Sequence, residues 1–314
     1  MAENKYTATD LKQMQQWPLE QKIQVAQTRI LEFALHYDNQ VFIAFSGGKD
    51  STVLLDLVRR VIPDAPAVFI DTGLEYPEVK EFVRSCENVE IRRPKRTFRE
   101  VIERFGYPVV SKKVAGYVST AKRNPNSTRA KYLSGELDSK IFGFGEGKWW
   151  YLVDAPFKIS DHCCDAMKKQ PNRQYTRETG RHPILGTLAS ESIARRNEWM
   201  RTGCNLFDST EPMCKPLSIW TDNDILEYIV RFNIPYCPLY GEIIKDKKGN
   251  WLTTGIHRTG CIFCAFGVQN DKCPNRFQQL KETHPKIWEY CMRPWDSGGL
   301  GMKEVLDYIH IPSE

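Results

Sequence analysis

Six consecutive residues, Ser46-Gly47-Gly48-Lys49-Asp50-Ser51, have the side-chain types that bind phosphate groups. Glycines let the backbone N–H groups approach a ligand closely, the hydroxyls and the lysine add donors, and a following helix would add the positive end of its dipole. The spacing is not that of the Walker pattern G-x-x-x-x-G-K-[ST], so transfer of a terminal phosphoryl group is not favoured. As a bare pattern, two glycines beside a lysine could also form a tight turn.

The cysteines are the second group of residues that could do chemistry. Cys163 and Cys164 are adjacent, and Cys261 and Cys264 form a C-x-x-C motif far along the chain. In a reducing compartment, thiols stay free, bind metal or react rather than form disulfides. If folding brings these four together, they could hold zinc or an iron–sulfur cluster, and the residue types alone leave both open. Cys273 is the candidate substitute if adjacent Cys163 cannot serve as a ligand.

Apolar runs on both sides of the six-residue loop predict the elements that position it. Gln40–Phe45 is typical of a buried strand, and the residues after Ser51 have helical spacing. Ala67–Ile70 and Val89–Ile91 predict two more strands, with a helix over Glu78–Cys86 between them. This alternation predicts an α/β fold with a doubly wound parallel sheet and helices on both faces. Ligands of such sheets bind beyond the carboxyl ends of the strands.

The remaining patterns divide the chain into three parts. Residues 1–38 are predicted to form a helical lead-in that breaks at Pro18, and residues 39–235 an α/β nucleotide-binding domain. Within that domain, residues 124–150 are rich in Gly, Lys, Ser and Asn and are interpreted as an insertion. Residues 236–314 are predicted to be a Cys-rich, mainly helical region packed on the core.

Composition limits the classes of protein that the chain can belong to. With 41% apolar residues among 314, it can build a substantial core. The polar start and the lack of an apolar run of about 18 residues argue against secretion and a membrane, so we expect a cytoplasmic protein. Residues 92–131 contain 12 Lys and Arg against two Glu. That stretch is a candidate nucleic-acid surface or a solvated face that steers a nucleotide.

Beyond the bare pattern, the loop resembles the PP-loop of the ATP pyrophosphatases. Within that superfamily, the chain is similar to the phosphoadenylyl-sulfate and adenylyl-sulfate reductases. The resemblance rests on Ser46–Ser51, on Phe69–Glu78, on Gly186–Arg196, and on Lys215–Leu217 with Trp220-Thr221. It implies a Rossmann-like, adenine nucleotide alpha-hydrolase-like fold.

The resemblance also implies roles for individual residues. The loop would grip the β- and γ-phosphates and leave the α-phosphorus open to attack. We expect Lys49, Asp50 and Arg195 to be the catalytic residues; guanidinium groups fork onto phosphate or sulfate oxygens, and the adjacent Arg196 could serve in place of Arg195. Asp50 and Asp71 could also hold Mg²⁺ beside the phosphates. The residues expected to bind the nucleotide outside the loop are Asp71, Thr72, Gly73, Gly186, Glu191 and Ser192.

For the cysteines, the resemblance favours one of the two kinds of metal site. Adenylyl-sulfate reductases carry a Cys-Cys pair and a later C-x-x-C that hold a [4Fe–4S] cluster. By this likeness Cys163, Cys164, Cys261 and Cys264 are the expected ligands, and zinc is the alternative.

Three functions are compatible with these features. The reductases use a C-terminal Glu-Cys-Gly-type nucleophile, whereas Val305–Glu314 contains no cysteine, and the complete loop suits ATP better than a sulfonucleotide. We therefore expect adenylation of a target by ATP for sulfur transfer, as in nucleic-acid thiolation or phosphorothioation, with a sulfur donor or a reductant protein as partner. The alternatives are reduction of adenylyl sulfate or phosphoadenylyl sulfate, and a nucleotide-binding regulatory protein without turnover.

Overall fold

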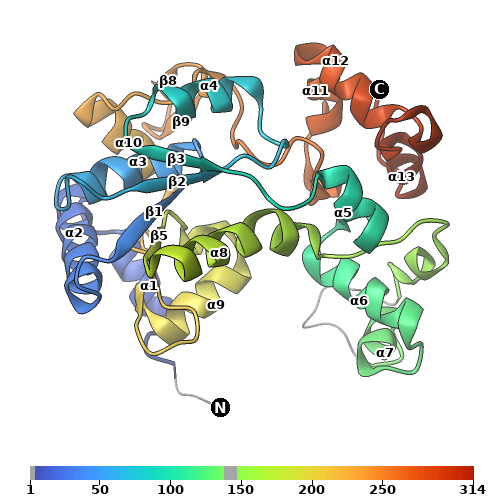
Figure 1. Ribbon diagram of the computed structural model, residues 1–314, viewed down its shortest axis with the longest axis horizontal. Coiled ribbons are helices and arrows are strands. Elements are labelled where there is room, and N and C mark those ends of the chain that lie inside the picture. Colours follow the sequence, from blue (N-terminus) through green and yellow to red (C-terminus); the bar gives the residue numbers. More distant parts are fainter. Residues whose placement is uncertain (1–3, 138–146) are drawn as a thin grey trace. The chain divides into compact units, whose positions relative to one another are not determined.

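A computed structural model describes residues 4–137 and 147–314 of the chain (Figure 1). The chain folds into two compact units, each assembled from segments that are separate in the sequence. Unit 1 comprises residues 1–71, 75–93 and 171–259, and unit 2 comprises residues 72–74, 94–170 and 260–314. The three predicted parts, 1–38, 39–235 and 236–314, describe continuous segments and remain a prediction about how the chain divides.

Unit 1 is built around a six-stranded sheet with the order β3-β2-β1-β5-β7-β6. Pairs β1–β2, β1–β5, β2–β3 and β5–β7 are parallel, and only the edge strand β6 runs antiparallel to its neighbour. The strands are β1 (Val41–Phe45), β2 (Ala67–Ile70), β3 (Val89–Arg92), β5 (His182–Leu185), β6 (Asn205–Leu206) and β7 (Met213–Cys214). The predicted fold class and the three predicted strands are confirmed.

Both faces of this sheet are covered, which explains why its strands read as continuous apolar runs. Alternate side chains of β1 point to opposite faces, so Ile43 and Phe45 join the main core while Phe42 packs with Tyr175 of α8 (Gln170–Thr179). The main core also contains side chains of α2 (Leu19–His36), α3 (Lys49–Arg59) and α10 (Asp222–Phe232).

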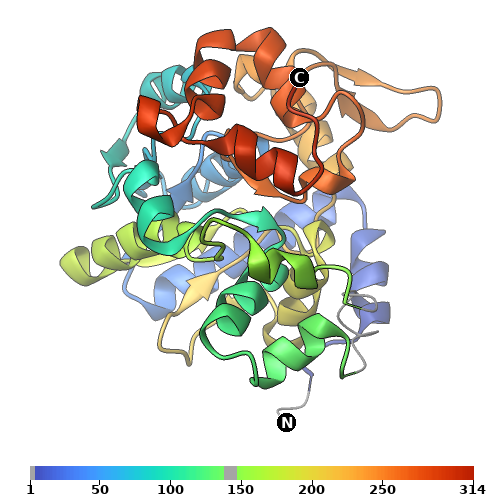
Figure 2. The same ribbon diagram turned by 90° about the vertical axis from the view of Figure 1, so that its right-hand side faces the viewer.

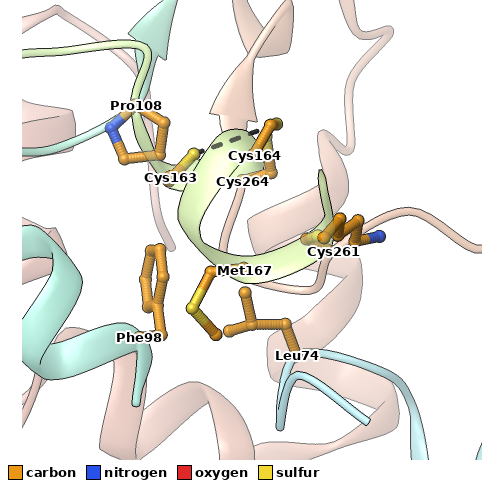
Figure 3. Close-up of a pocket in the computed structure, with 9 residues that line it drawn as sticks. Leu74, Phe98, Pro108, Cys163, Cys164, Met167, Cys261 and Cys264 are labelled. Carbon is orange, nitrogen blue, oxygen red and sulfur yellow. Dashed lines mark hydrogen bonds between the residues drawn. The ribbon is translucent and has the colours of Figure 1, made fainter. Parts of the chain in front are cut away.

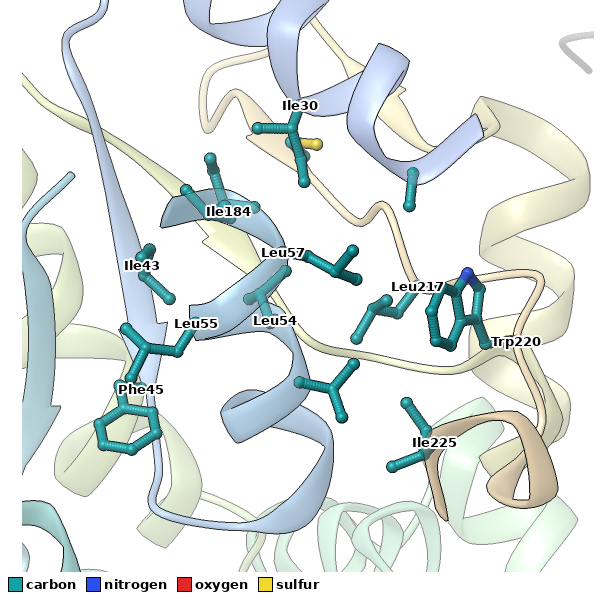
Figure 4. Packing of buried hydrophobic residues seen from close by; sticks show 14 of the residues in the cluster. Ile30, Ile43, Phe45, Leu54, Leu55, Leu57, Ile184, Leu217, Trp220 and Ile225 are labelled. Carbon is teal, nitrogen blue, oxygen red and sulfur yellow. The ribbon is translucent and has the colours of Figure 1, made fainter. Parts of the chain in front are cut away.

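The main core can be followed in Figure 4, where Leu54 and Leu57 of α3 lie between the sheet and Trp220. Both leucines have no exposed surface, and neither does Trp220. Full burial of one such leucine side chain contributes about 1.5–3 kcal/mol. This packing fixes α3 against β1. The two elements meet at residues Ser46–Ser51, which we call the phosphate-type loop.

Helix ends in unit 1 follow local sequence signals. The predicted break at Pro18 separates α1 (Ala8–Gln15) from α2. Thr221 caps α10 through a capping box with Asp224. Asp224 also accepts a 2.6 Å hydrogen bond from buried Lys22, which ties α2 to α10.

The rest of unit 1 consists of shorter elements. They are α4 (Pro77–Ser85), a 3-10 turn η4 (Ala189–Glu191), α9 (Ile193–Thr202), a 3-10 turn η5 (Pro238–Tyr240) and the hairpin of β8 (Ile243–Lys245) and β9 (Trp251–Thr253). The hairpin is the orange two-stranded projection in Figure 2.

Unit 2 is mainly helical, with one short parallel pair formed by β4 (Val109–Val110) and β10 (Ala265–Phe266). Its helices are α5 (Phe98–Phe105), α6 (Lys112–Arg123), α7 (Thr128–Ser134), α11 (Arg276–Thr283), α12 (Pro285–Met292) and α13 (Met302–Tyr308). Its single-turn segments are η2 (Trp150–Asp154), η3 (Asp165–Lys169), η6 (Val268–Asn270) and η7 (Trp295–Ser297).

The segment interpreted as an insertion, 124–150, is partly outside the described residues because 138–146 are not among them. Its first half is ordered as α7, whose N-cap Ser127 accepts a hydrogen bond from the Ala130 N–H. Toward the C-terminus, the region is Cys-bearing and helical as expected, and β10 adds a strand that was not predicted. Within the described part of the chain, no helix has the length and apolarity to cross a membrane.

Candidate functional site

The loop between β1 and α3 follows the strand at which the sheet order changes direction: β2 and β3 lie on one side of β1, and β5 and β7 lie on the other. Crevices at such positions are the usual ligand sites of doubly wound sheets. Gly47 has a φ of +70°, and a Cβ there would lie 2.8 Å from side-chain carbons of Val79 and Val83. Only glycine fits, because α4 packs directly on the loop.

Hydroxyl groups hold the loop in shape from inside. Ser46 and Ser51 oxygens are 2.9 Å apart, and the Ser46 N–H donates to Ser51 Oγ at 3.2 Å. The Gly48 carbonyl accepts from the hydroxyls of Ser51 and Thr52 at 2.9 and 3.0 Å. Gly48 is the N-cap of α3 and has no side chain that could accept a hydrogen bond from the first turn of the helix.

Lys49 is buried, with 2% of its surface exposed, although it carries a charge. Its Nζ donates to Asp222 at 2.8 Å and to Asp50 at 3.1 Å. Burial alone would lower the pKa of Lys49, but Asp50 and Asp222 outweigh it and raise that pKa. Burial opposes the shift at Asp222 too, yet the Lys49 hydrogen bond and charge lower the pKa of Asp222. The lysine is therefore held protonated beside the loop.

Two further hydroxyls reach the loop from the end of unit 1. The Lys49 N–H donates to Tyr240 Oη at 3.1 Å, and Tyr240 Oη lies 2.9 Å from Thr259 Oγ1. Thr259 Oγ1 would be 2.8 Å from a Cβ on Gly48, so it contacts the glycine closely. The sequence did not indicate a role at the loop for Tyr240, Thr259 or Asp222, because they are far from the loop along the chain and belong to no recognisable motif.

The predicted residues after β5 are also brought to this place. A Cβ on Gly186 would lie 3.1 Å from the Asp50 carbonyl oxygen, so the exit of β5 packs on the first turn of α3. Ser192 caps α9 by accepting from the Arg195 N–H at 3.2 Å. Glu191 pairs with Arg195 and also with Arg258.

Arg195 lies in a crowded electrostatic environment. Burial and the charge of Arg258 lower the pKa of Arg195, while the charge of Asp50 opposes that shift. Two guanidinium groups thus share the carboxylate of Glu191 beside the loop. Forked donors of this kind suit phosphate or sulfate oxygens. Arg258 is a second residue for such a role that the sequence did not indicate.

The motif after β2 is divided between the two units. Asp71 follows β2 in unit 1 and pairs with Lys80 at 2.8 Å and with Arg93 at 3.7 Å. Thr72 and Gly73 belong to unit 2, where Thr72 Oγ1 accepts from the Leu74 N–H at 3.2 Å. Each of the two carboxylates expected to hold Mg²⁺, Asp50 and Asp71, has a lysine partner in this structure.

The four predicted cysteine ligands line one pocket of unit 2. Cys163 and Cys164 precede the π-helical turn η3, and their sulfurs are 4.0 Å apart. Cys261 and Cys264 lie on the facing segment (Figure 3). The other lining residues are Leu74, Phe98, Pro108, Met167 and Lys168.

Charges and burial give the thiols of this pocket different acidities. The Cys164 contact and burial raise the pKa of Cys163. The Cys163 hydrogen bond and the charges of Lys112 and Lys168 overcome burial and lower the pKa of Cys164 to about 6. Burial raises the pKa of Cys264 to about 11. The pocket therefore contains one thiol that ionises readily and two that resist ionisation.

The donor set has the chemistry of an iron–sulfur ligand set, four thiols in one largely apolar pocket. Among residues 4–137 and 147–314, no three His, Cys, Asp or Glu side chains are grouped to hold a single metal ion. The free space in the pocket that these residues line is about 20 Å³. Cys273, the substitute ligand, is exposed and is not a lining residue of this pocket.

One arginine, Arg276, binds the backbone at the end of the C-x-x-C segment. Arg276 donates to the carbonyl oxygens of Cys264 and Phe266, each at 3.1 Å, and pairs with both carboxylate oxygens of Asp271 at 2.7 Å. The Ile262 N–H also donates to the Leu74 carbonyl at 2.8 Å. The backbone around Cys261 and Cys264 is thus fixed by hydrogen bonds to Arg276 and to Leu74.

Several cations of the basic stretch 92–131 are used within the protein. Arg92 pairs with Glu90 and Glu178, Lys122 donates to the carbonyls of Ala155 and Phe157, and Lys131 pairs with Glu136. The ion pairs of Arg92 and Lys131 reduce the charge that the stretch can offer a polyanion. Its role as a nucleic-acid surface stays a prediction.

Comparison with known proteins shows which family the chain is related to. The profile of the phosphoadenosine phosphosulfate reductase domain matches residues 40–127 and 136–265, more than half of the chain. Adenosine 5'-phosphosulfate reductase 1 of Bacillus subtilis is 35% identical over 209 residues, which cover 66% of this chain and 70% of that protein. An uncharacterized protein of Methanocaldococcus jannaschii is 24% identical over 255 residues, 79% of this chain.

This chain spans only 40% and 45% of the lengths of two such uncharacterized M. jannaschii proteins. Among solved structures, the phosphoadenylyl-sulfate reductase of Candida auris is 15% identical, with a TM-score of 0.39, and the match covers 78% of this chain and 97% of that one. The U34-tRNA thiolase NcsA of Methanococcus maripaludis, solved with its [4Fe–4S] cluster, is 14% identical, with a TM-score of 0.34 and coverages of 95% and 82%.

Proposed function

Because the chain belongs to the phosphoadenosine phosphosulfate reductase domain family, we propose that it is an enzyme of sulfur metabolism that acts on a nucleotide. Its reaction is cleavage of ATP between the α- and β-phosphates, which adenylates a target for sulfur transfer. The observation that carries this proposal is the loop Ser46–Ser51 at the carboxyl end of β1, with protonated Lys49 buried beside it. Such a loop offers amides, hydroxyls and one cation to a diphosphate.

In the proposed reaction, an oxygen of the target attacks the α-phosphorus, and the bond from that phosphorus to the bridging oxygen breaks. Pyrophosphate leaves on the loop, and a sulfur nucleophile then displaces AMP. Lys49 would neutralise charge on the leaving pyrophosphate, and Arg195 would bind oxygens of the α-phosphate. Asp50 is the carboxylate that would hold Mg²⁺ beside the phosphates.

The cysteine pocket is the proposed place of a [4Fe–4S] cluster, held by Cys163, Cys164, Cys261 and Cys264. Bound there, the cluster would supply iron that can bind or exchange sulfur. The protein contributes a largely apolar wall that limits water and two lysines that favour the thiolate of Cys164. The sulfur acceptor remains a prediction, with nucleic acid as the candidate through residues 92–131.

A second candidate function is reduction of a sulfonucleotide, and one observation favours it. The 35% identity to the B. subtilis adenosine 5'-phosphosulfate reductase is the highest among the relatives described above. For that reaction the substrate would be adenylyl sulfate or phosphoadenylyl sulfate, and the product would be sulfite.

Product analysis separates these functions. The protein, purified without oxygen, is incubated with ATP and Mg²⁺ and the phosphorus products are identified by ³¹P NMR, alone and with candidate acceptors. AMP with pyrophosphate is the expected result, and ADP contradicts the proposal. Sulfite released from adenylyl sulfate with thioredoxin would establish reduction instead. Retention of nucleotide without any product would indicate a regulatory binding protein.

A further inference from the structure

Two donors of Lys49, in the phosphate-type loop, already donate to oxygen atoms of distant residues of the protein. The Lys49 N–H donates to Tyr240 Oη at 3.1 Å, and Lys49 Nζ donates to Asp222 Oδ1 at 2.8 Å. Thr259 Oγ1 completes the group, 2.9 Å from Tyr240 Oη and in close contact with Gly48. We call these three oxygens the internal oxygen set. Tyr240 Oη and Asp222 Oδ1 lie on donors of Lys49 that would bind phosphate oxygens, and Thr259 Oγ1 supports Tyr240 Oη.

A ligand must displace this set before it can use the same donors. A single phosphate or sulfate would exchange one group of hydrogen bonds for another of similar number, and such exchanges contribute little net free energy. It would also separate Lys49 from Asp222, whose negative charge would then repel the anion. Two linked phosphates reach more donors of the loop at once, and so they can offset the displacement.

The displaced groups would not be left without partners. Tyr240 keeps its contact with Thr259, and Asp222 Oδ2 lies 4.0 Å from His257 Nε2. Lys49 keeps Asp50 at 3.1 Å. The internal oxygen set can therefore move aside at a moderate cost, as a two-state element must if a ligand is to shift it.

We propose that Tyr240, Asp222 and Thr259 are specificity-determining residues, which make the loop accept a linked diphosphate and reject single phosphate or sulfate ions. This inference rests on the proposed function, in which the loop binds the β- and γ-phosphates of ATP. It narrows the substrate class to nucleotides with a pyrophosphate group and disfavours adenylyl sulfate as the ligand of this loop. It also assigns a role to residues that lie outside every sequence motif.

The displacement has a local consequence that can be measured. Thr259 is followed by Gly260 and Cys261, so when Tyr240 and Thr259 move aside together, the backbone that leads to the C-x-x-C segment must move with Thr259. Amide hydrogen exchange in residues 256–261 should become faster when diphosphate binds.

The test is calorimetric titration of the full chain with three probes, magnesium pyrophosphate, inorganic phosphate and sulfate. The variants are Tyr240→Phe and Asp222→Asn, each of which removes one oxygen or one charge of the internal oxygen set. Tyr236→Phe is the matched control, because its hydroxyl donates to the Gly241 carbonyl at 2.9 Å and is not part of the set. Thermal unfolding of every variant checks that the fold is retained.

We expect the wild type to bind pyrophosphate and to bind phosphate or sulfate at least 100-fold more weakly. Each variant should bind single anions about tenfold more tightly, because one competing hydrogen bond or charge is gone, while Tyr236→Phe should match the wild type. In Tyr240→Phe, exchange of residues 256–261 should already be fast without ligand.

Two results would overturn the inference while leaving the proposed function intact. One is weaker pyrophosphate binding by Tyr240→Phe, which would make the hydroxyl a donor to the ligand. The other is a wild-type loop that binds phosphate as tightly as pyrophosphate. If no probe binds to any variant, and Lys49→Met changes nothing, both the inference and the proposed function fail.

Discussion

The phosphate-type loop and the cysteine pocket surround their buried reactive groups with opposite kinds of neighbours, charged and polar in the loop and largely apolar in the pocket. In the loop, the charge of Lys49 is balanced by Asp50 and Asp222, and the Lys49 N–H donates to Tyr240 Oη. In the pocket, the walls around the thiols are largely apolar, and burial raises the pKa of Cys264. The comparison teaches that the loop balances its buried charge with carboxylates of the chain, whereas the pocket raises the pKa of Cys163 and Cys264 and lowers that of Cys164.

The largest effect should come from the cysteine pocket. Replacing Cys261 by Ser should reduce the iron of an anaerobically reconstituted protein from about four atoms per chain toward zero, since a [4Fe–4S] cluster is held by four thiolates. The broad absorption near 400 nm should disappear with it, at roughly the wavelength expected for iron–sulfur charge transfer. Iron analysis and the absorption spectrum measure both.

Cys273→Ser is the matched control for this substitution. Cys273 is exposed and its thiol lies 3.9 Å from Gln278 Oε1, outside the pocket lining. Its replacement should leave iron content unchanged. Loss of iron in Cys273→Ser, with retention in Cys163→Ser, would show that Cys273 replaces Cys163 as a ligand.

The next effect concerns the loop. Lys49→Met removes the cation that would neutralise the leaving pyrophosphate, so the rate of AMP formation should fall on the order of 10²–10³-fold, as when one donor of an electrostatic site is lost. The measurement is steady-state AMP release at saturating ATP. Lys247→Ala, an exposed lysine in the β8–β9 turn, should keep the wild-type rate. An unchanged rate in Lys49→Met would remove this lysine from the proposed chemistry.

A smaller effect is expected at alkaline pH, where Tyr107 of unit 2 should lower the free energy of unfolding. In unit 2, Tyr107 Oη donates to the Leu300 carbonyl at 2.7 Å, and burial raises the pKa of Tyr107 to about 12. Between pH 10 and 12, the unfolded chain has therefore lost this proton while the native protein keeps it. The free energy of unfolding must fall as pH rises through that window, and the contribution is fully present below pH 10.

Urea unfolding at several pH values tests this expectation. Tyr107→Phe should lose the part of the alkaline decline that this hydroxyl causes, although it also loses the hydrogen bond to Leu300 at every pH. Tyr290→Phe is the control, because that tyrosine is 37% exposed. A decline of the same slope in Tyr107→Phe as in the wild type would contradict the assignment.

What the sequence predicted depended on signals that are local. The runs that became β1 and β2 are apolar at every position because both faces of the sheet are covered, and Pro18 predicted the break between α1 and α2. The insertion assigned to 124–150 missed α7, since a Gly- and Asn-rich composition concealed the cap at Ser127.

The partners of Lys49 could not be predicted because they come from distant positions. Asp222 is 173 residues away and Tyr240 is 191 residues away, and each is brought to the loop only by packing of α10 and η5. Asp222 looked like an ordinary acidic residue in the first turn of a helix, where such residues are common for reasons of the helix dipole. Arg258 had no signal beyond its proximity to Cys261.

The smallest effect is expected at acidic pH in unit 1, where protonation of Asp222 should lower the free energy of unfolding. Lys49 lowers the pKa of Asp222 below its ordinary 3.8, against the opposing influence of burial. The stability from this ion pair is therefore fully present above pH 3.8 and is lost as pH falls through the folded-state pKa. Because the Asp222 side chain is 43% exposed, the contribution should be at most about 1 kcal/mol, the range of exposed ion pairs.

Urea unfolding between pH 6 and pH 3 would measure it. The difference in unfolding free energy between the wild type and Asp222→Asn should be positive at pH 6 and should shrink below pH 3.8, because asparagine has no proton to gain. Glu227→Gln, on the same helix, should give a difference that does not follow this course. A difference that grows in acid would mean that Asp222 destabilises the folded loop when ionised, and the loop would then not be balanced by its own carboxylates.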